Sequence, residues 1–250
     1  MSRNFELMQE LSVNSWQQRP KRITDTIVAD DDAMPAHPTG AVLPASDEVL
    51  RLVQRVFLQT QQCPRVVAFA GVNGGEGCSR ICASAAEVLA GTVTGSVCLV
   101  DANFRSPALP SLFQTTNHHG LTNSLLSEGP IRSFAKPMSE DKKLWLLSSG
   151  ALGIDSANLL TSERLKARVG ELRGEFEFVL IDTPPMTPYG DAITIGPLTD
   201  GLIMIIEAES TRREPALTAA DALRTAGIPI LAAVLNNRTF PIPESLYSRL

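Results

Sequence analysis

The sequence predicts an α/β domain with a doubly wound, mainly parallel β-sheet and helices on both faces of the sheet. Short, almost continuously apolar runs rich in β-branched residues recur along the chain, and helix-like stretches separate them. Continuous apolar strands of this kind are typical of parallel sheets that are buried on both faces. The predicted strands span residues 66–70, 97–100, 144–147, 178–181, 202–206 and 230–235.

The predicted helices combine apolar residues spaced three and four apart with polar residues that can cap a first turn. They span residues 46–62, 79–89, 162–172, 191–198 and 213–226. The pairs Thr161-Ser162 and Ser210-Thr211 precede two of these helices and are expected to cap them.

The chain of 250 residues is long enough for one sizeable α/β domain with additional tails. Residues 1–45 are predicted to be a flexible N-terminal tail, because several prolines and an acidic run at 30–32 discourage a packed core. The domain is expected to span residues 46–240, followed by a C-terminal tail at 241–250.

The composition excludes several classes of protein. A net charge of -5 with no basic stripe argues against a nucleic-acid partner. No apolar run approaches the roughly 20 residues that span a bilayer, and the first residues carry no secretory signal pattern, so a cytoplasmic location is expected. The 4 cysteines form no C-x-x-C pair and are expected to be reduced, while His118 and His119 are expected at the surface.

The stretch GVNGGEGCSR, residues 71–80, lies between a predicted strand and a predicted helix. Glycines in such a turn let backbone N–H groups approach a phosphate, and the helix N-terminus adds positive potential. Gly74, Gly75 and Gly77 supply this backbone, and the hydroxyl of Ser79 is placed to bind Mg²⁺. The stretch therefore predicts a phosphate-binding loop for ATP, with a ligand-free glycine-rich turn as the alternative.

Cys78 occupies the position at which such loops carry lysine. An ammonium group at about 4 Å from a phosphate oxygen contributes about 4 kcal/mol at an effective dielectric constant near 20. Its loss is expected to weaken binding or rate by roughly a thousandfold. Arg80 lies close enough along the chain to reach a phosphate, and partial compensation by its charge is a hypothesis.

Two other predicted strands end in aspartate. Asp101 closes the first of them within VCLVDANFRSP, and Asn103 and Arg105 follow it. Asp182 closes the second within FEFVLIDTPPMTPYGDA, which ends with Asp191 and an alanine. The carboxyl ends of parallel strands share one edge of the sheet, where ligand sites form. These carboxylates are therefore expected to meet the glycine loop in one crevice.

Together the three motifs resemble those of the bacterial tyrosine kinases (BY-kinases) of capsule and exopolysaccharide synthesis, which are relatives of the deviant P-loop ATPases that position the division site. The family's loop P-G-E-G-K-S-T is similar to residues 74–80, its D-x-D-x-R-x-P to residues 101–107, and its I-D-T-P-P to residues 181–185. The resemblance extends over residues 48–237. It implies a P-loop NTPase fold, ATP and Mg²⁺ as ligands, and phosphoryl transfer to tyrosine.

The resemblance assigns the nucleotide-binding loop to seven consecutive residues: Gly74, Gly75, Glu76, Gly77, Cys78, Ser79 and Arg80. It implies that Ser79, Asp101 and Asp182 hold Mg²⁺, with Asp182 acting directly or through water. It also implies that Asp101 is the base or metal-positioning carboxylate for the attacking tyrosine hydroxyl, and that Arg105 is catalytic.

The chain departs from the family pattern at three positions of the site. Cys78 replaces lysine, Arg80 replaces threonine, and Asn103 replaces the second aspartate of its motif, where an amide cannot act as a general base. The family's C-terminal tyrosine cluster is reduced to Tyr247, and Tyr189 is the other tyrosine of the chain. Phosphorylation of Tyr247 is open, and an ordinary surface tyrosine is the simpler interpretation.

The helix that precedes the sheet carries a partial match to E-x-x-R-x-x-R, which the family uses for ring assembly. Glu48 and Arg51 match, but Gln54 takes the next position and Arg55 lies one step beyond it. A solvated charged face explains these residues equally well, so self-association is a possible consequence only. The resemblance further implies a separate transmembrane chain-length regulator, or a companion kinase, as partner.

Three hypotheses about function stay open from the sequence. The chain is a regulator or scaffold with a degraded nucleotide site, an active ATP-dependent tyrosine autokinase or ATPase that uses Arg80, or another accessory ATPase in cellulose synthesis or positioning. Cys78 and Cys82 also suggest a redox switch, if the helix N-terminus lowers a thiol pKa. Packing by two small helix residues is the simpler interpretation of that pair.

Overall fold

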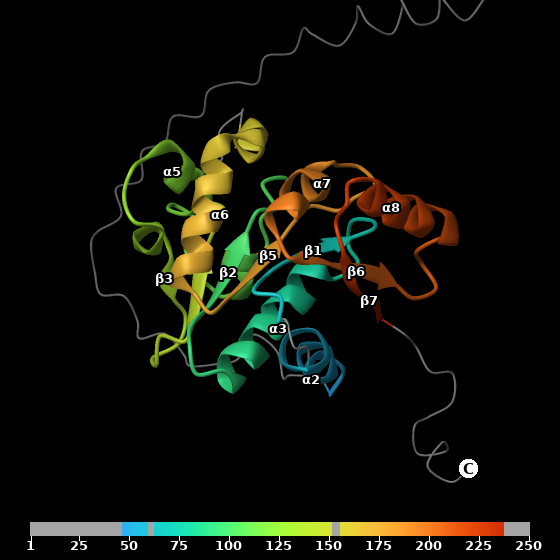
Figure 1. The fold of residues 1–250 in the computed structure, drawn as a ribbon, viewed down its shortest axis with the longest axis horizontal. Coiled ribbons are helices and arrows are strands. Elements are labelled where there is room, and N and C mark those ends of the chain that lie inside the picture. Colours follow the sequence, from blue (N-terminus) through green and yellow to red (C-terminus); the bar gives the residue numbers. More distant parts are fainter. Residues whose placement is uncertain (1–46, 60–62, 152–155, 238–250) are drawn as a thin grey trace, which may run out of the picture. The chain divides into compact units, whose positions relative to one another are not determined.

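The computed structural model describes residues 47–59, 63–151 and 156–237, which form a 7-stranded sheet with helices on both faces (Figure 1). The strand order is β3-β4-β2-β5-β1-β6-β7. Every pairing is parallel except that of β3 with β4. The predicted doubly wound, mainly parallel architecture is confirmed.

All the predicted strands are present, and their bounds agree with the prediction to within about one residue at each end. The added strand is β3, a two-residue antiparallel pairing at the edge of the sheet that is too short for a periodic signal. The strands are β1 (Val66–Gly71), β2 (Val97–Asp101), β3 (Lys136–Pro137), β4 (Leu144–Leu147), β5 (Phe178–Asp182), β6 (Gly201–Glu207) and β7 (Ile230–Asn236).

The longer helices also follow the prediction, and the short α4 and α5 were missed because they span too few turns to show a period. The helices are α2 (Asp47–Val53), which continues as a π-helix (Gln54–Leu58), α3 (Cys78–Thr92), α4 (Leu109–Leu112), α5 (Leu121–Leu126), α6 (Glu163–Glu175), α7 (Asp191–Ile195) and α8 (Arg213–Thr225). Short 3₁₀ turns add Ile131–Phe134, Ser156–Thr161 and Gly196–Leu198.

One of the two predicted caps is confirmed and the other is wrong. The Ser162 hydroxyl oxygen accepts a hydrogen bond from the backbone N–H of Leu165 and caps α6. At α8 the capping position belongs to Arg212, whose side chain makes no cap hydrogen bond. The hydroxyl of Thr211 donates instead to the carboxylate of Glu76, so a tertiary contact has replaced the expected local one.

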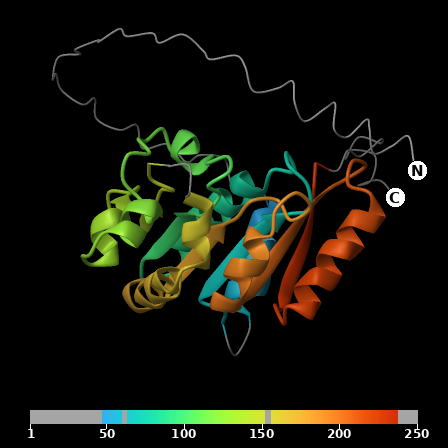
Figure 2. The same ribbon diagram turned by 90° about the horizontal axis from the view of Figure 1, so that it is seen from above.

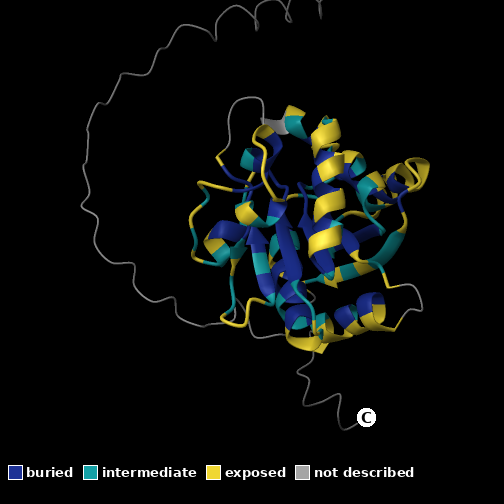
Figure 3. Ribbon diagram, turned by 60° about the vertical axis from the view of Figure 1, so that its left-hand side comes forward, coloured by how far each residue is buried: buried dark blue, intermediate teal, exposed yellow. Residues whose placement is uncertain are grey.

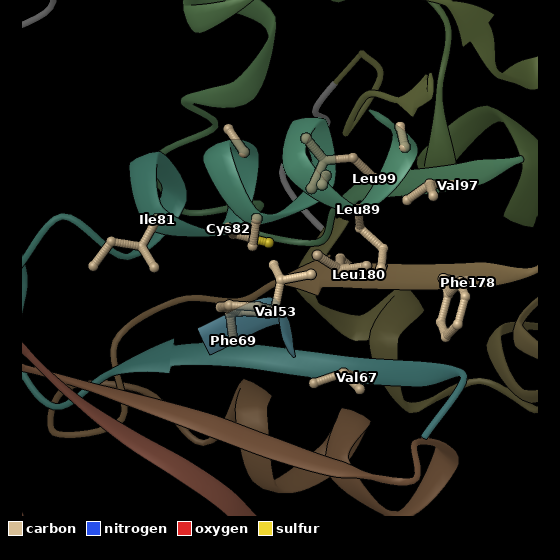
Figure 4. Close-up of a cluster of buried hydrophobic side chains, with 14 of the residues drawn as sticks. Val53, Val67, Phe69, Ile81, Cys82, Leu89, Val97, Leu99, Phe178 and Leu180 are labelled. Carbon is tan, nitrogen blue, oxygen red and sulfur yellow. The ribbon is translucent and has the colours of Figure 1, made fainter. Parts of the chain in front are cut away.

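Each face of the sheet packs against its own set of helices (Figures 1 and 2). On one face, Phe69 and Leu180 pack with Cys82 and Leu89 of α3 and with Val53 of α2 (Figure 4). On the opposite face the sheet packs against α5, α6, α7 and α8. The central strands are buried on both sides and the helices expose their outer surfaces (Figure 3), as a doubly wound domain requires.

The predicted tails at 1–45 and 241–250, and Tyr247, lie outside the described residues. Within the described part of the chain, no helix combines the length and apolar character needed to cross a membrane. His118 and His119 are exposed, as expected. The charged residues of α2, including Glu48 and Arg51, also face solvent.

Candidate functional site

Three segments that carry the predicted motifs meet at the carboxyl ends of the central strands. In the parallel register, Asp182 at the end of β5 lies beside Phe69 of β1 and beside Asp101 of β2. The glycine loop follows β1 and leads directly into α3, which begins at Cys78. The order of the strands therefore places the loop and both aspartates at one rim of the sheet.

A direct hydrogen bond joins the loop to β5. The hydroxyl of Ser79 donates to Oδ2 of Asp182 over 2.5 Å. Asp182 is 0% exposed, and its Oδ1 atom accepts no hydrogen bond from the described residues. An unpaired carboxylate oxygen next to a hydroxyl suits a hard cation such as Mg²⁺, which prefers oxygen ligands. The residues present thus fit the metal that the sequence implies.

The backbone of the loop has the shape of a phosphate cradle. Gly75 (φ 89°) and Gly77 (φ 81°) adopt the left-handed conformation that glycine enters without strain. At Gly77 a Cβ atom would lie 2.5 Å from Nδ2 of Asn236. That amide donates to the carbonyl oxygen of Glu76 over 2.9 Å, so the end of β7 fixes the loop.

Glu76 points its side chain beneath the loop and not into solvent. It is 2% exposed, and its Oε1 accepts hydrogen bonds from Thr211 Oγ1 (2.5 Å) and Asn73 Nδ2 (3.1 Å). Its Oε2 atom has no hydrogen-bond partner among the described residues. Thr211 escaped the sequence analysis because it lies 135 residues from Glu76, and no spacing rule connects the two.

Cys78 takes the lysine position but directs its thiol into the protein. The residue is half-buried as a whole, and its thiol is buried close to the carboxylate of Asp182. Burial, the negative charge of Asp182 and the neighbouring Cys82 together raise the pKa of the Cys78 thiol well above its ordinary value. The expectation of a thiol pKa lowered by the helix N-terminus is therefore wrong, because desolvation and like charge outweigh the helix dipole.

Both aspartates of the rim ionise less readily than a solvated carboxylic acid. Burial raises the pKa of Asp182 to about 7, although hydrogen bonds from Ser79 and Cys78 oppose the shift. Burial and the charge of Asp182 raise the pKa of Asp101 to about 8. Two adjacent buried carboxyl groups without a cation favour protonation of at least one of them.

Asp101 also holds the loop that follows β2. Its Oδ1 accepts the backbone N–H of Asn103 (3.1 Å), and its Oδ2 accepts that of Leu109 (3.2 Å). Asn103, which replaces the second aspartate of the motif, accepts the N–H of Ser106 through Oδ1 over 3.0 Å. Through these contacts Asp101 and Asn103 stabilise the loop that follows β2. The proposed role of Asp101 as base or metal ligand stays a prediction.

The two arginines of the predicted site lie in different surroundings. Nε of Arg105 is 3.2 Å from Oδ2 of Asp191, and its guanidinium carbon lies 4.8 Å from the ring centre of Tyr189. Arg80 is exposed on α3 and forms no ion pair with any residue that the structure describes. Its use in place of lysine stays a hypothesis.

No family model matches the chain. Curated proteins do match it: the tyrosine-protein kinase YwqD of Bacillus subtilis is 34% identical over 164 residues, 66% of this chain and 68% of that protein. The putative tyrosine-protein kinase CapB of Staphylococcus aureus is 26% identical over 149 residues, 60% and 65% of the two chains. The succinoglycan biosynthesis transport protein ExoP of Rhizobium meliloti is 28% identical over 178 residues, 69% of this chain and 22% of ExoP.

Solved structures share the fold. The chimeric protein CapA2B2 superposes with a TM-score of 0.73 at 22% identity, over 79% of this chain and 87% of that one. The kinase domain of the Escherichia coli tyrosine kinase ETK gives 0.67 at 20% identity, over 72% and 69%. A plasmid partition protein of Borrelia burgdorferi gives 0.52 at 19% identity, over 75% and 87%. These likenesses confirm the P-loop ATPase-like fold.

Proposed function

The chain belongs to the bacterial tyrosine kinase family, and on that basis we propose that it serves capsule or exopolysaccharide synthesis as a regulator or scaffold whose nucleotide site has lost its principal cation. The names of the relatives support the process: one is a putative tyrosine-protein kinase, CapB, and another is a succinoglycan biosynthesis transport protein, ExoP. The sequence and structure of the loop support the loss of the cation.

The observation that carries the proposal is that Cys78 stands at the lysine position of the loop, with its thiol buried close to the carboxylate of Asp182. A lysine at this position would present an ammonium group to the β- and γ-phosphates, whereas the protonated thiol presents no charge. Among the described residues, no lysine or arginine side chain forms a hydrogen bond or ion pair with Glu76, Asp101 or Asp182. Phosphates would therefore meet an acidic rim.

Two other features of the loop support its origin as a nucleotide site. Ser79 and Asp182 would hold Mg²⁺, and the left-handed glycines shape the cradle. A bound Mg²⁺ would supply the positive charge that neutralises phosphate oxygens during phosphoryl transfer. Without the lysine, the affinity for the nucleotide is expected to fall by roughly a thousandfold, from about 4 kcal/mol of lost attraction.

A protein with this fold and a weak nucleotide site acts through its surfaces. We assign it a transmembrane chain-length regulator or a companion kinase as partner, at the inner face of the membrane. The charged outer side of α2, which carries Glu48 and Arg51, is the surface available for self-association.

The test is a titration with a fluorescent ATP analogue and Mg²⁺. Wild type should bind weakly, and Cys78→Lys should bind roughly a thousandfold more tightly because it restores the ammonium group. Cys78→Ser is the matched control, since it removes the thiol without adding charge and should bind as wild type does. Micromolar binding with hydrolysis by wild type would overturn the proposal.

The second candidate is an active tyrosine autokinase in which Arg80 replaces the lysine. The exposed side chain of Arg80, in the first turn of α3 and without an ion pair to a described residue, favours this alternative. Arg80→Ala separates the two candidates. A loss of nucleotide binding and autophosphorylation in this variant would support the active kinase, and unchanged weak binding supports the regulator.

A further inference from the structure

The glycine loop lies over a buried carboxylate that a distant turn helps to hold. Glu76 stands between the left-handed Gly75 and Gly77, and the residue is 2% exposed. Its Oε2 atom has no hydrogen-bond partner among the described residues, and its Oε1 atom accepts from Asn73 and from Thr211. Burial of a half-paired carboxylate is costly, so each of these two donors matters for keeping it in place.

Thr211 belongs to a closed turn between β6 and α8 (Figure 1). Its backbone N–H donates to the carbonyl oxygen of Glu207 over 3.0 Å, and the N–H of Glu207 donates to its hydroxyl oxygen over 3.0 Å. These reciprocal bonds fix the position of the hydroxyl oxygen. A hydroxyl group has one proton, and that of Thr211 is directed to the carboxylate of Glu76.

We infer that Thr211 is a positioning residue for the nucleotide loop and that it acts through Glu76. The inference deepens the proposed function and rests on the assignment of residues 74–80 to nucleotide binding. Without the hydroxyl, the buried carboxylate keeps Asn73 as its one side-chain donor among the described residues, and solvent becomes the more favourable place for it. A Glu76 side chain that turns outward twists the loop, and its backbone N–H groups then no longer converge on a phosphate.

The two long-range contacts of Glu76 have separate effects. Nδ2 of Asn236 donates to the backbone carbonyl oxygen and fixes the peptide, whereas the hydroxyl of Thr211 holds the side chain. A fixed peptide leaves the side chain free to rotate, so Asn236 does not replace Thr211. Serine offers the same donor and acceptor as threonine on a short side chain, and valine has the shape of threonine with neither.

NMR relaxation of the full chain without nucleotide measures the order of the loop. The amide order parameters of Gly75 and Gly77 should be about 0.85 in wild type and below about 0.6 in Thr211→Val. Thr211→Ser keeps the hydroxyl and should keep the wild-type values. Thr218→Val is the matched control, because it removes a threonine hydroxyl that donates to Glu214 within α8, and it should also keep them.

Nucleotide binding is measured in the Cys78→Lys background, where the restored ammonium group makes the affinity easy to measure. Adding Thr211→Val should raise the dissociation constant of the fluorescent ATP analogue with Mg²⁺ about tenfold, through the loss of one hydrogen bond to a charged group. Adding Thr211→Ser or Thr218→Val should leave it unchanged. A purely structural role of Thr211 would lower the stability in urea without moving the affinity or the order parameters.

A double-mutant cycle tests the route through Glu76. In Glu76→Ala the hydroxyl of Thr211 has lost its acceptor. Adding Thr211→Val to this variant should therefore leave the order parameters of Gly75 and Gly77 as they are. In the Cys78→Lys background it should change the dissociation constant by less than about twofold.

Three results would overturn the inference. Order parameters and affinity unchanged by Thr211→Val would show that the hydroxyl does not hold the loop. Values in Thr211→Ser as low as those in Thr211→Val would show that the methyl group, and not the hydroxyl, is responsible. An equal effect of Thr211→Val with and without Glu76 would exclude the route through this carboxylate. Tight nucleotide binding by wild type overturns the proposed function alone, because the order parameters are measured without nucleotide.

Discussion

Asp200 and Asp182 lie at opposite ends of the parallel strands and have opposite surroundings. At the amino ends, Asp200 accepts hydrogen bonds from both terminal nitrogens of Arg173 (2.8 and 3.0 Å) and from the N–H groups of Arg65 (2.7 Å) and Val66 (2.9 Å). At the carboxyl ends, Asp182 accepts a hydrogen bond from the Ser79 hydroxyl over 2.5 Å, and its Oδ1 atom has no partner among the described residues.

The acidities follow from these surroundings. Partial burial opposes ionisation of Asp200, but the hydrogen bonds from Arg173 and the backbone lower its pKa below the usual value. Burial raises the pKa of Asp182 to about 7. The carboxylate of Asp200, which joins neighbouring elements, is fully paired, whereas the buried carboxyl group of Asp182 has an unpaired oxygen and loses stability when it ionises. Perturbed, incompletely paired groups of this kind cluster at functional sites.

The largest expected change in the free energy of unfolding comes from neutralising Asp182, at the carboxyl ends of the strands. The folded pKa of Asp182 is raised, so its contribution to stability is complete below the unfolded pKa near 3.9 and is lost as pH rises through about 7. Asp182→Asn removes this penalty. At pH 8.5 we expect the variant to be more stable than wild type by about 4 kcal/mol, and at pH 4 to be nearly equal. Urea unfolding at the two pH values measures the difference.

The matched control for this prediction is Asp221→Asn, on the exposed side of α8. It should leave the pH dependence of unfolding as in wild type. The same decline in stability from pH 4 to 8.5 in Asp182→Asn and in wild type would contradict the comparison of the two rims. The stability of Asp182→Asn should still fall with rising pH, though less than that of wild type, because burial also raises the pKa of Asp101 to about 8.

Neutralising Asp200, at the amino ends of the strands, is expected to change the stability in the opposite direction. Asp200→Asn removes the charge that Arg173 and two backbone N–H groups bind, and should destabilise the protein by about 2 kcal/mol at neutral pH. Because the folded pKa of Asp200 is lowered, its contribution is present above the unfolded pKa and disappears as pH falls through the folded pKa. Thermal unfolding at pH 7 and pH 3 should show a larger loss at the higher pH than at the lower pH. Destabilisation of equal size at both would show that packing, and not charge, is responsible.

A smaller effect is expected for the hydroxyl of the loop. Millimolar Mg²⁺ should raise the melting temperature of wild type at pH 8, because the cation relieves the unpaired carboxylate of Asp182. Ser79→Ala removes one proposed ligand and should reduce this gain by about 1 kcal/mol. Ser84→Ala, at a buried serine farther along α3, is the control and should keep the full response to Mg²⁺. An identical Mg²⁺ response in both variants would remove Ser79 from the metal site.

Some features of the two ends of the sheet could be predicted from the sequence, and others could not. The strands and the meeting of Asp101 with Asp182 were predictable, because apolar runs such as residues 178–181 mark buried strands and parallel strands end at one rim. The long-range contacts that fix the glycine loop were not predictable. Asn236 and Thr211 contact Glu76 across 160 and 135 residues, and only the folded chain brings them together. The direction of the Cys78 pKa shift was missed for the same reason, since desolvation depends on packing that no local pattern encodes.

The smallest expected effect concerns the reactivity of Cys78. Burial and the charge of Asp182 keep its thiol protonated, so at pH 7.5 it should react with a maleimide at least about tenfold more slowly than a small free thiol. Asp182→Asn removes the nearby charge and should speed the reaction, while Asp200→Asn, at the other rim, should leave it unchanged. Mass spectrometry of the labelled peptide measures each rate. Labelling of Cys78 as fast as a free thiol would restore the redox-switch hypothesis, and it would show that the thiol is less enclosed and less exposed to negative charge than its burial close to Asp182 implies.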